Sequence, residues 1–174
     1  MELLKIAEMG NPVLRKVAKK VGAIDTSILE LIKKMKFTVG KVGGVGLAAP
    51  QVFHSKRIFV VASKPNVRYP NAPLMEPEAI INPAINYMSD EIVKDWEGCL
   101  SIPGIRGLVP RAKSIKVEYT NRNGERVKKQ FDGFVARIFQ HEFDHIEGIM
   151  FLERIESTKD LVTEKEYQRI ISEQ

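Results

Sequence analysis

The sequence has very little cysteine and histidine, and it has no long apolar run. Its 174 residues include one cysteine and three histidines. A single cysteine excludes an intramolecular disulfide and is typical of a reducing compartment. No segment approaches the roughly 20 apolar residues that span a bilayer, and residues 1–7 lack the basic and apolar pattern of a signal peptide. These absences predict a cytoplasmic protein, or one of an organelle lumen, with no membrane partner.

Positive charge is present but is not concentrated in one segment. The net charge is +5, yet lysine and arginine are spread along the chain without a block of five. Such a balance serves solubility as readily as binding. We therefore expect no specific nucleic-acid site, although the charge is compatible with a weak preference for an RNA-rich particle. The length and the 44% of apolar residues are ordinary for one globular domain.

Three segments have helical patterns. Residues 27–39 carry apolar side chains three and four apart, and Ser27 and Glu30 have the spacing of a capping box. A second helix, from residue 132 or 133 to about 147, has apolar residues nearly all round, which is typical of a helix buried on most sides. The third segment, about residues 163–172, has a capping box of its own. We expect this last helix to be peripheral.

Four segments have the composition of β-strands, and they complete a single α+β domain. Pro83 is expected to end the second of them, and Asn123-Gly124 predicts a tight hairpin turn between the last two. Several prolines mark residues 63–77 as an extended loop. The predicted strands are residues 57–62, 79–82, 114–119 and 126–131. We predict one catalytic domain over residues 1–174, in which antiparallel or mixed β-sheets wrap around a central metal-binding helix.

The central helix carries a metal-binding pattern, His141-Glu142-Phe143-Asp144-His145. Histidines four residues apart lie on one helix face, one turn apart, and can reach a single ion. Glu142 lies beside them, where it can contact a metal-bound water without ligating the metal. The alternative is a set of hydrogen-bonded core residues, but three ionisable groups on an apolar helix are costly without an ion. The pattern predicts a hydrolytic metal centre.

The third ligand is less certain from the residues alone. Catalytic sites generally have three protein ligands and an open position for water. An extended protease pattern would need histidine at position 151, where the chain has Phe151. Glu164, Glu166 and His54 are candidates, but Cys99 is the only thiol. A Cys/His/His set suits Fe, Zn, Co or Ni, so Cys99 is favoured over the alternative of a small buried hydrophobe.

A glycine-rich segment, residues 44–51, joins the first helix to a strand. It is not a phosphate-binding loop, because no Gly-Lys-Ser or Gly-Lys-Thr follows. Small residues at this density indicate that another group packs closely against the backbone. Gln51 is the polar exception, and its amide could donate to an oxyanion. A surface glutamine after a turn is the competing interpretation.

Taken together, three segments resemble the peptide deformylase family. That family has the motifs GxGLAAPQ, EGCLS and QHExDHxxG in this order. The chain has GVGLAAPQ at residues 44–51, EGCLS at residues 97–101 and QHEFDHIEG at residues 140–148. Similarity extends to residues 11–15 and 106–111, and overall it covers about residues 2–156. Three ordered motifs are far more specific than the histidine pattern alone.

The resemblance implies a reaction and a set of roles. The family removes the formyl group from the N-terminal formyl-methionine of newly made polypeptides, so N-formyl-methionyl nascent peptides would be the partners. One divalent ion would be bound, Fe²⁺ in the cell, with Zn²⁺, Ni²⁺ or Co²⁺ able to replace it. Glu142 would be the general base and then the general acid. The implied metal ligands are Cys99, His141 and His145, and the implied oxyanion donors are Gln51 and the backbone N–H of Leu100.

The resemblance also implies the substrate contacts. The backbones of Val45, Gly46 and Gly98 would line the peptide, Arg106 would contact the substrate, and Glu97 would pair with Arg111. Selectivity for methionine needs an apolar pocket. The candidates for its walls are Val45, Leu100, Phe134 and Ile138, the last being one turn before the first histidine of the motif.

Two departures and three competing functions accompany this interpretation. Many relatives have glycine where this chain has Phe53, and the loop at residues 63–77 is longer than in the shortest members. A zinc peptidase would use a carboxylate such as Glu164 as third ligand and leave Cys99 idle. A non-catalytic binder of formylated N-termini would lack the base that Glu142 supplies. A structural metal site would usually have four protein ligands.

Overall fold

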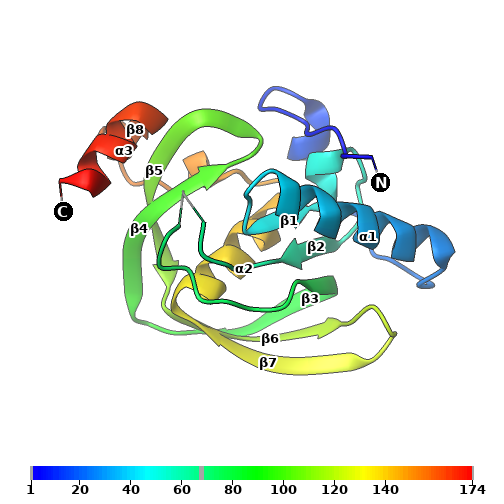
Figure 1. Cartoon of the computed structure of the whole chain (residues 1–174). Helices are drawn as coiled ribbons and strands as arrows, with labels where there is room; N and C mark the ends of the chain where they lie inside the picture. The colour runs from blue at the N-terminus through cyan, green and yellow to red at the C-terminus, as the bar shows by residue number, and fades with distance from the viewer. Residues whose placement is uncertain (1, 67–68, 174) are drawn as a thin grey trace.

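Two antiparallel sheets surround a central helix in the computed structural model (Figure 1), which describes residues 2–66 and 69–173. Residues 67–68 of the predicted loop lie outside that part. The larger sheet has the order β1-β2-β3-β6-β7, and the smaller has the order β4-β5-β8. The strands are β1 (Gly46–Ala48), β2 (Ile58–Val61), β3 (Glu78–Met88), β4 (Ile92–Cys99), β5 (Ile102–Ala112), β6 (Ser114–Thr120), β7 (Arg126–Asp132) and β8 (Leu161–Thr163).

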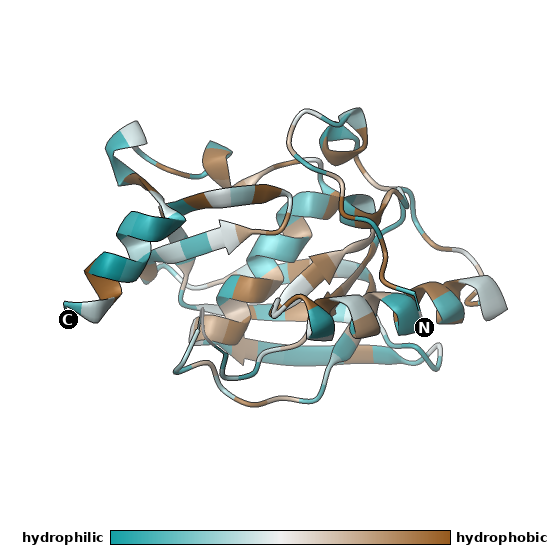
Figure 2. Ribbon diagram, turned by 45° about the horizontal axis from the view of Figure 1, so that its top comes forward, coloured by the Kyte–Doolittle hydropathy of each residue, from teal (hydrophilic) through white to brown (hydrophobic). Residues whose placement is uncertain are grey.

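The helices have different positions relative to the sheets. They are α1 (Thr26–Lys41), α2 (Gly133–Ile146) and α3 (Glu164–Ser172), with 3₁₀ turns at Pro12–Arg15, Ala49–Val52, Phe151–Glu153 and Thr158–Asp160. Helix α2 contacts β1, β2, β6 and β7 of the larger sheet and β5 of the smaller one. Figure 2 shows α3 as a largely hydrophilic helix at the edge of the molecule. The predicted α+β domain with a central helix is confirmed.

The core explains why α2 occupies the centre. Phe139 and Ile146 of this helix are fully buried, and they join an apolar cluster with Phe59 of β2 and Ile115 of β6. The rings of Phe59 and Phe139 meet edge to face, with centroids 4.9 Å apart. A helix that is apolar nearly all round can bury all its faces only between layers. This placement brings the polar residues of α2 into the interior as well.

Helix α1 begins at Thr26, one residue before the predicted range, because its cap is Asp25 rather than Ser27. Asp25 has extended backbone angles, and its carboxylate accepts the N–H of Ile28 at 3.0 Å. Ser27 lies inside the helix and donates its hydroxyl to Asp25. Aspartate is as effective a helix cap as serine, so the capping box predicted at Ser27 and Glu30 is wrong. The apolar face packs on β1 and β2 as expected.

The strand predicted to end at Pro83 continues for several residues. Strand β3 pairs with β6 on both sides of Pro83, with a shift of register between Ile81 and Ala84. Asn82 takes a left-handed conformation there (φ 49°) and bonds the backbone N–H and C=O of Val21. Such a bulge accommodates a residue that lacks an N–H. The hairpin of β6 and β7 forms at Asn123-Gly124 as predicted.

The β4–β5 hairpin was not predicted, although it carries one of the three motifs. The first four residues of β4 are exposed and only Glu97 is buried, so no buried face marks the strand in the sequence, and four glycines and prolines interrupt β5. The two strands pair from Ile92 with Ala112 to Cys99 with Ile102. The hairpin therefore places Cys99 at the end of β4, facing α2. None of the described helices is long and apolar enough to cross a membrane.

Candidate active site and metal centre

Three predicted ligands converge on one point in the interior. Cys99 ends β4, and His141 and His145 lie one turn apart on α2. Their ligand atoms lie within 4.8 Å of one another, and Sγ of Cys99 is 3.2 Å from Nε2 of His145. Both histidines are buried, and Cys99 is partly buried. The structure thus brings together the thiol and the two imidazoles that the sequence singled out.

The chemistry of these donors fits a divalent metal ion. Burial lowers the pKa of His145 well below its ordinary value, which keeps the imidazole neutral and able to ligate. Burial acts the same way on His141, but hydrogen bonds and charge from Cys99 and Glu97 outweigh it and raise the pKa of His141. A thiolate with two imidazoles is a ligand set that suits Fe, Zn, Co or Ni.

The other candidate ligands are engaged elsewhere. Glu164 accepts two hydrogen bonds from Arg106, and Glu166 pairs with Arg169 on the surface of α3. His54 is exposed, after the 3₁₀ turn at Ala49–Val52. Among the described residues, the group of histidine, cysteine and carboxylate side chains close enough to hold an ion is the cysteine and histidine set above. The geometry therefore does not favour a carboxylate as third ligand.

Glu97 holds His141 in place. Its carboxylate accepts Nδ1 of His141 at 2.8 Å and two bonds from Arg111, at 2.9 and 3.0 Å. Burial alone would raise the pKa of Glu97, but Arg111 and His141 outweigh it and lower that pKa well below its usual range. Glu97 is therefore ionised and fixes which nitrogen of His141 faces the cluster. The predicted pair of Glu97 and Arg111 is confirmed.

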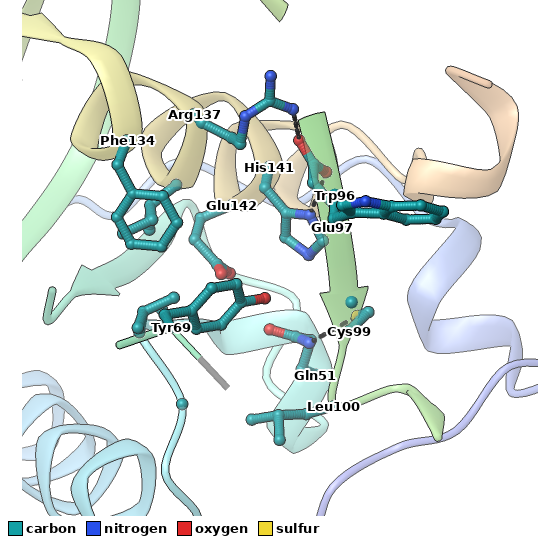
Figure 3. A pocket seen from close by; sticks show the side chains of 15 residues that line it. Gln51, Tyr69, Trp96, Glu97, Cys99, Leu100, Phe134, Arg137, His141 and Glu142 are labelled. Atoms are coloured by element: carbon teal, nitrogen blue, oxygen red, sulfur yellow. Dashed lines mark hydrogen bonds and ion pairs between the residues drawn. The ribbon is translucent and has the colours of Figure 1, made fainter. Parts of the chain in front are cut away.

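Glu142 is buried beside the cluster with a free oxygen. Its Oε2 has no hydrogen-bond partner among the described residues, although buried polar atoms rarely lack one. Burial raises the pKa of Glu142 to about 7. A carboxyl group with a pKa near neutrality can both accept and return a proton. The side chain points into the cavity below His141 (Figure 3).

Gly46 leaves the space that Glu142 occupies. A Cβ atom at residue 46 would lie 2.8 Å from Cδ of Glu142, which is closer than real Cβ contacts. Replacing Gly46 with alanine would therefore push the carboxylate aside. We expect roughly a 10²-fold loss of kcat/KM, because a misplacement of about 1 Å can cost this much. Gly40→Ala in α1 is the matched control, since a Cβ there meets nothing within 4 Å. Equal activity of the two variants would contradict the role of this contact.

Gln51 is oriented by the protein rather than by solvent. Its Oε1 accepts the N–H of Ala48 at 2.8 Å, and its Nε2 donates to Oγ of Ser101 at 3.2 Å and to Sγ of Cys99 at 3.4 Å. The side chain is 1% exposed, so the alternative of a surface glutamine is wrong. The N-terminal segment fixes the same region, since Ala7 N–H bonds the carbonyl of Gln51. The amide donor is thus held beside the cluster.

A cavity opens onto these groups. Glu142, Gln51 and Cys99 face it, together with the rings of Tyr69 and Phe134, whose centroids are 5.1 Å apart (Figure 3). The predicted wall residues Val45, Gly46, Gly98, Leu100, Phe134 and Ile138 all line it. Tyr69, Trp96 and Arg137 also line it and were not predicted. Of these only Arg137 had a signal, since it is four residues before a ligand on the same helix.

Arg106, for which the resemblance implies a contact with the substrate, is buried next to the cavity. It is 1% exposed and does not line the main cavity. Its guanidinium donates to both oxygens of Glu164 and to the hydroxyl of Tyr69, and it lies over the rings of Tyr69 and Tyr167. A Cβ on Gly98 would lie 2.7 Å from its Nη1. Arg106 therefore supports the wall of the cavity from behind, because three of its N–H groups hold Tyr69 and Glu164.

This arrangement makes α3 a support for the cavity. Glu164→Gln should weaken the hydrogen bonds that hold Arg106, and Tyr69 should then be held less firmly because Arg106 bonds its hydroxyl. The pair is partly exposed at Glu164, so we expect a loss of about 1 kcal/mol and roughly a fivefold rise in KM at nearly constant kcat. Glu166→Gln, which removes a surface pair of the same helix, is the control. Unchanged KM in Glu164→Gln would mean that Tyr69 is held without α3.

A thiol and two imidazoles beside an unpaired buried carboxyl group, on an α+β fold, define a metal-dependent hydrolase. The family model described as polypeptide deformylase matches residues 3–161. The chain belongs to that family, and it is an enzyme that removes the N-formyl group from nascent peptides. Recognition of the family from its three motifs is thereby confirmed.

Relatives and solved structures agree with this assignment. Peptide deformylase 2 of Nostoc sp. (strain PCC 7120) is 56% identical over 172 residues, which cover 98% of this chain and 96% of the relative. A class I type b peptide deformylase from Acinetobacter baumannii has a TM-score of 0.87 and 45% identity, over 88% of this chain and 99% of that one. The peptide deformylase from Thermotoga maritima has a TM-score of 0.81 and 42% identity, over 90% and 100% of the two chains.

Proposed function

We propose that residues 1–174 form one catalytic domain that deformylates the N-terminal formyl-methionine of new polypeptides and releases formate. Cys99, His141 and His145 would hold one divalent ion, Fe²⁺ in the cell, with Zn²⁺, Ni²⁺ or Co²⁺ as possible replacements. The observation that carries the proposal is the convergence of these three ligand atoms beside the unpaired oxygen of Glu142. Three protein ligands are typical of a catalytic rather than a structural site.

In this proposal Glu142 transfers protons, and the amide donors stabilise the charge that develops on the formyl oxygen. When bound, a divalent ion would polarise the formyl carbonyl and favour ionisation of water. Glu142 takes a proton from the water that attacks the formyl carbon, and its pKa near 7 suits this transfer. The N–H of Leu100 would donate to the formyl oxygen as it gains charge, and Nε2 of Gln51 would donate to it in exchange for its long bond to Sγ of Cys99. Glu142 then returns the proton to the leaving amine.

The cavity walls would select methionine at the first position. Val45, Leu100, Phe134 and Ile138 supply apolar surface around it, and an unbranched thioether fits an irregular apolar pocket well. The backbones of Gly46 and Gly98 would line the peptide chain. The related enzyme from Acinetobacter baumannii has a structure described as bound to Met-Ala-Ser. A peptide that begins with methionine is therefore the natural first substrate.

Two further proposals concern the setting of the reaction. The ribosome is the source of nascent chains, so a weak association with it would favour early deformylation, and the net charge of +5 is compatible with it. A bacterial-type cytosol is the compartment that suits an enzyme with a single reduced thiol. We propose no membrane partner and no specific nucleic-acid site.

Formate release from formyl-Met-Ala-Ser tests the proposed function. The protein is purified without oxygen, because Fe²⁺ beside a thiolate is prone to oxidation, and its metal content is measured. We expect about one ion per chain and steady formate release. Preparations loaded with Fe²⁺, Co²⁺, Ni²⁺ or Zn²⁺ are compared in parallel, and we expect the Fe²⁺ form to lose activity in air. Absence of formate release from every loaded form would overturn the proposal and direct the search to other N-acyl substrates.

A further inference from the structure

Arg137 is a buried charged residue that the mechanism leaves without a role. It lies on α2 four residues before His141, on the same helix face. Its Nη1 donates to Oε1 of Glu97 at 2.9 Å, and Figure 3 shows the guanidinium above that carboxylate. The side chain is 7% exposed. A guanidinium buried this deeply must be neutralised and fully bonded to be tolerated.

The remaining bonds of Arg137 fix it to the smaller sheet. Nη1 also donates to the carbonyl of Val109 on β5 at 2.8 Å, and Nη2 donates to the carbonyl of Val93 on β4 at 2.6 Å. These acceptors belong to main chain in paired strands, so they cannot move independently. The planar guanidinium is thus held in one orientation. Its contact with Glu97 is therefore fixed in position.

Glu97 receives four donors, two on each oxygen. Oε1 accepts from Arg111 and Arg137, and Oε2 accepts from Arg111 and from Nδ1 of His141. Arg111 is shared, because its Nη1 is bonded to Asp144 at 2.6 Å. Without Arg137, the only donor left to Oε1 would be Arg111. The guanidinium of Arg111 is bonded to Asp144 as well as to Glu97. The carboxylate could then tilt about its bond to Arg111 and move away from His141.

We propose that Arg137 is a positioning residue for the reaction: it locks the carboxylate of Glu97, and through it the ring of His141. The inference rests on the proposed role of His141 as a metal ligand. Partners that orient a ligating histidine typically change metal affinity by about 10- to 100-fold. Arg137 would thus control how firmly the ion is held without touching the ion or the substrate.

Arg137→Met tests this inference in the zinc-loaded enzyme. The chain has only three histidines, so ¹⁵N-histidine spectra can be assigned by single substitutions. We expect the Nδ1–H signal of His141 to exchange faster with solvent, and zinc release to a chelator to accelerate about tenfold or more. In the Fe²⁺ form, kcat should fall while KM for formyl-Met-Ala-Ser changes less than about twofold.

Two further variants keep the test decisive. Arg154→Met removes a partly exposed guanidinium that contacts Asp144 and not Glu97, and it should leave the His141 signal and zinc release as in the unmodified enzyme. Arg137→Lys keeps the charge but cannot span Glu97 and both carbonyls, so it should release zinc faster even if Arg137→Met does not fold.

The outcomes separate this inference from its rivals. A lower melting temperature with unchanged zinc release and an unchanged His141 signal would mean that Arg137 only connects α2 to the smaller sheet and does not position His141. A rise in KM alone would make it only a wall of the cavity, which it also lines. Either result overturns the proposal. Failure of the proposed function would appear differently, as absence of bound metal or of formate release in the unmodified enzyme.

Discussion

Replacing Glu142 with glutamine will reduce kcat for formate release by roughly 10³-fold, within the range that a general base contributes. Glutamine has nearly the same shape, so the contact with Gly46 and the buried position are kept. It cannot accept a proton from water or return one to the amine. Because burial raises the pKa of Glu142 to about 7, the side chain is poised for both transfers at neutral pH, and the amide loses both.

The control for this result is the metal content of the Glu142→Gln variant. Glu142 is adjacent to the ligand cluster but is not part of it, so the variant should bind one ion per chain, as the unmodified enzyme is expected to do. Substrate affinity should also be nearly unchanged, which places the loss in kcat. A variant that keeps full activity with its metal bound would show that another group moves the proton. Loss of metal from this variant would show that the carboxylate is needed to retain the ion.

The parts of this enzyme that the sequence predicted correctly depend on local spacing. His141 and His145 lie one turn apart in any helix, so their convergence needs no tertiary information. The apolar surround of α2 likewise predicts burial at the centre. The β6–β7 hairpin follows from Asn123-Gly124 and the alternation on either side of it. Each of these features involves residues that are close in the chain.

The features that were missed depend on distant residues. Tyr69 reaches the cavity because its hydroxyl meets Arg106, 37 positions away, and no pattern in the proline-rich loop marks it. Arg137 bonds Glu97, 40 positions away. The exposed residues of β4 carry no alternating apolar signal, so the strand that delivers Cys99 was not predicted, and only the motif marked the cysteine itself. The misplaced cap of α1 is a smaller error, since Asp25 and Ser27 are both competent caps.

The substrate contact that the motif implies for Arg106 stays a prediction. The residue occupies the expected place in the chain, but here Glu164 of α3 and Tyr69 of the long loop take up its donors. Both partners lie in segments whose roles the motifs do not specify. In this chain the orientation of Arg106 is therefore set by the loop and the last helix.

Replacing Cys99 with alanine will abolish metal binding and, with it, all formate release. Two imidazoles remain, which is fewer than the three protein ligands that catalytic sites generally use, and the described structure offers no other donor within reach of the cluster. Because metal binding contributes to folding, the melting temperature of the variant should no longer rise when the ion is added. Metal analysis after gel filtration and melting curves with and without metal measure both effects.

Glu164→Gln is the counterpart that separates a deformylase from a zinc peptidase. A peptidase would use a carboxylate such as Glu164 as its third ligand, would keep its metal without Cys99 and would lose it without Glu164. The structure places Glu164 in a bidentate pair with Arg106, so we expect Glu164→Gln to retain a full complement of metal. If Cys99→Ala retained the ion and Glu164→Gln lost it, the ligand set proposed here would be wrong. The opposite pattern would leave the thiolate as the ligand that completes the site.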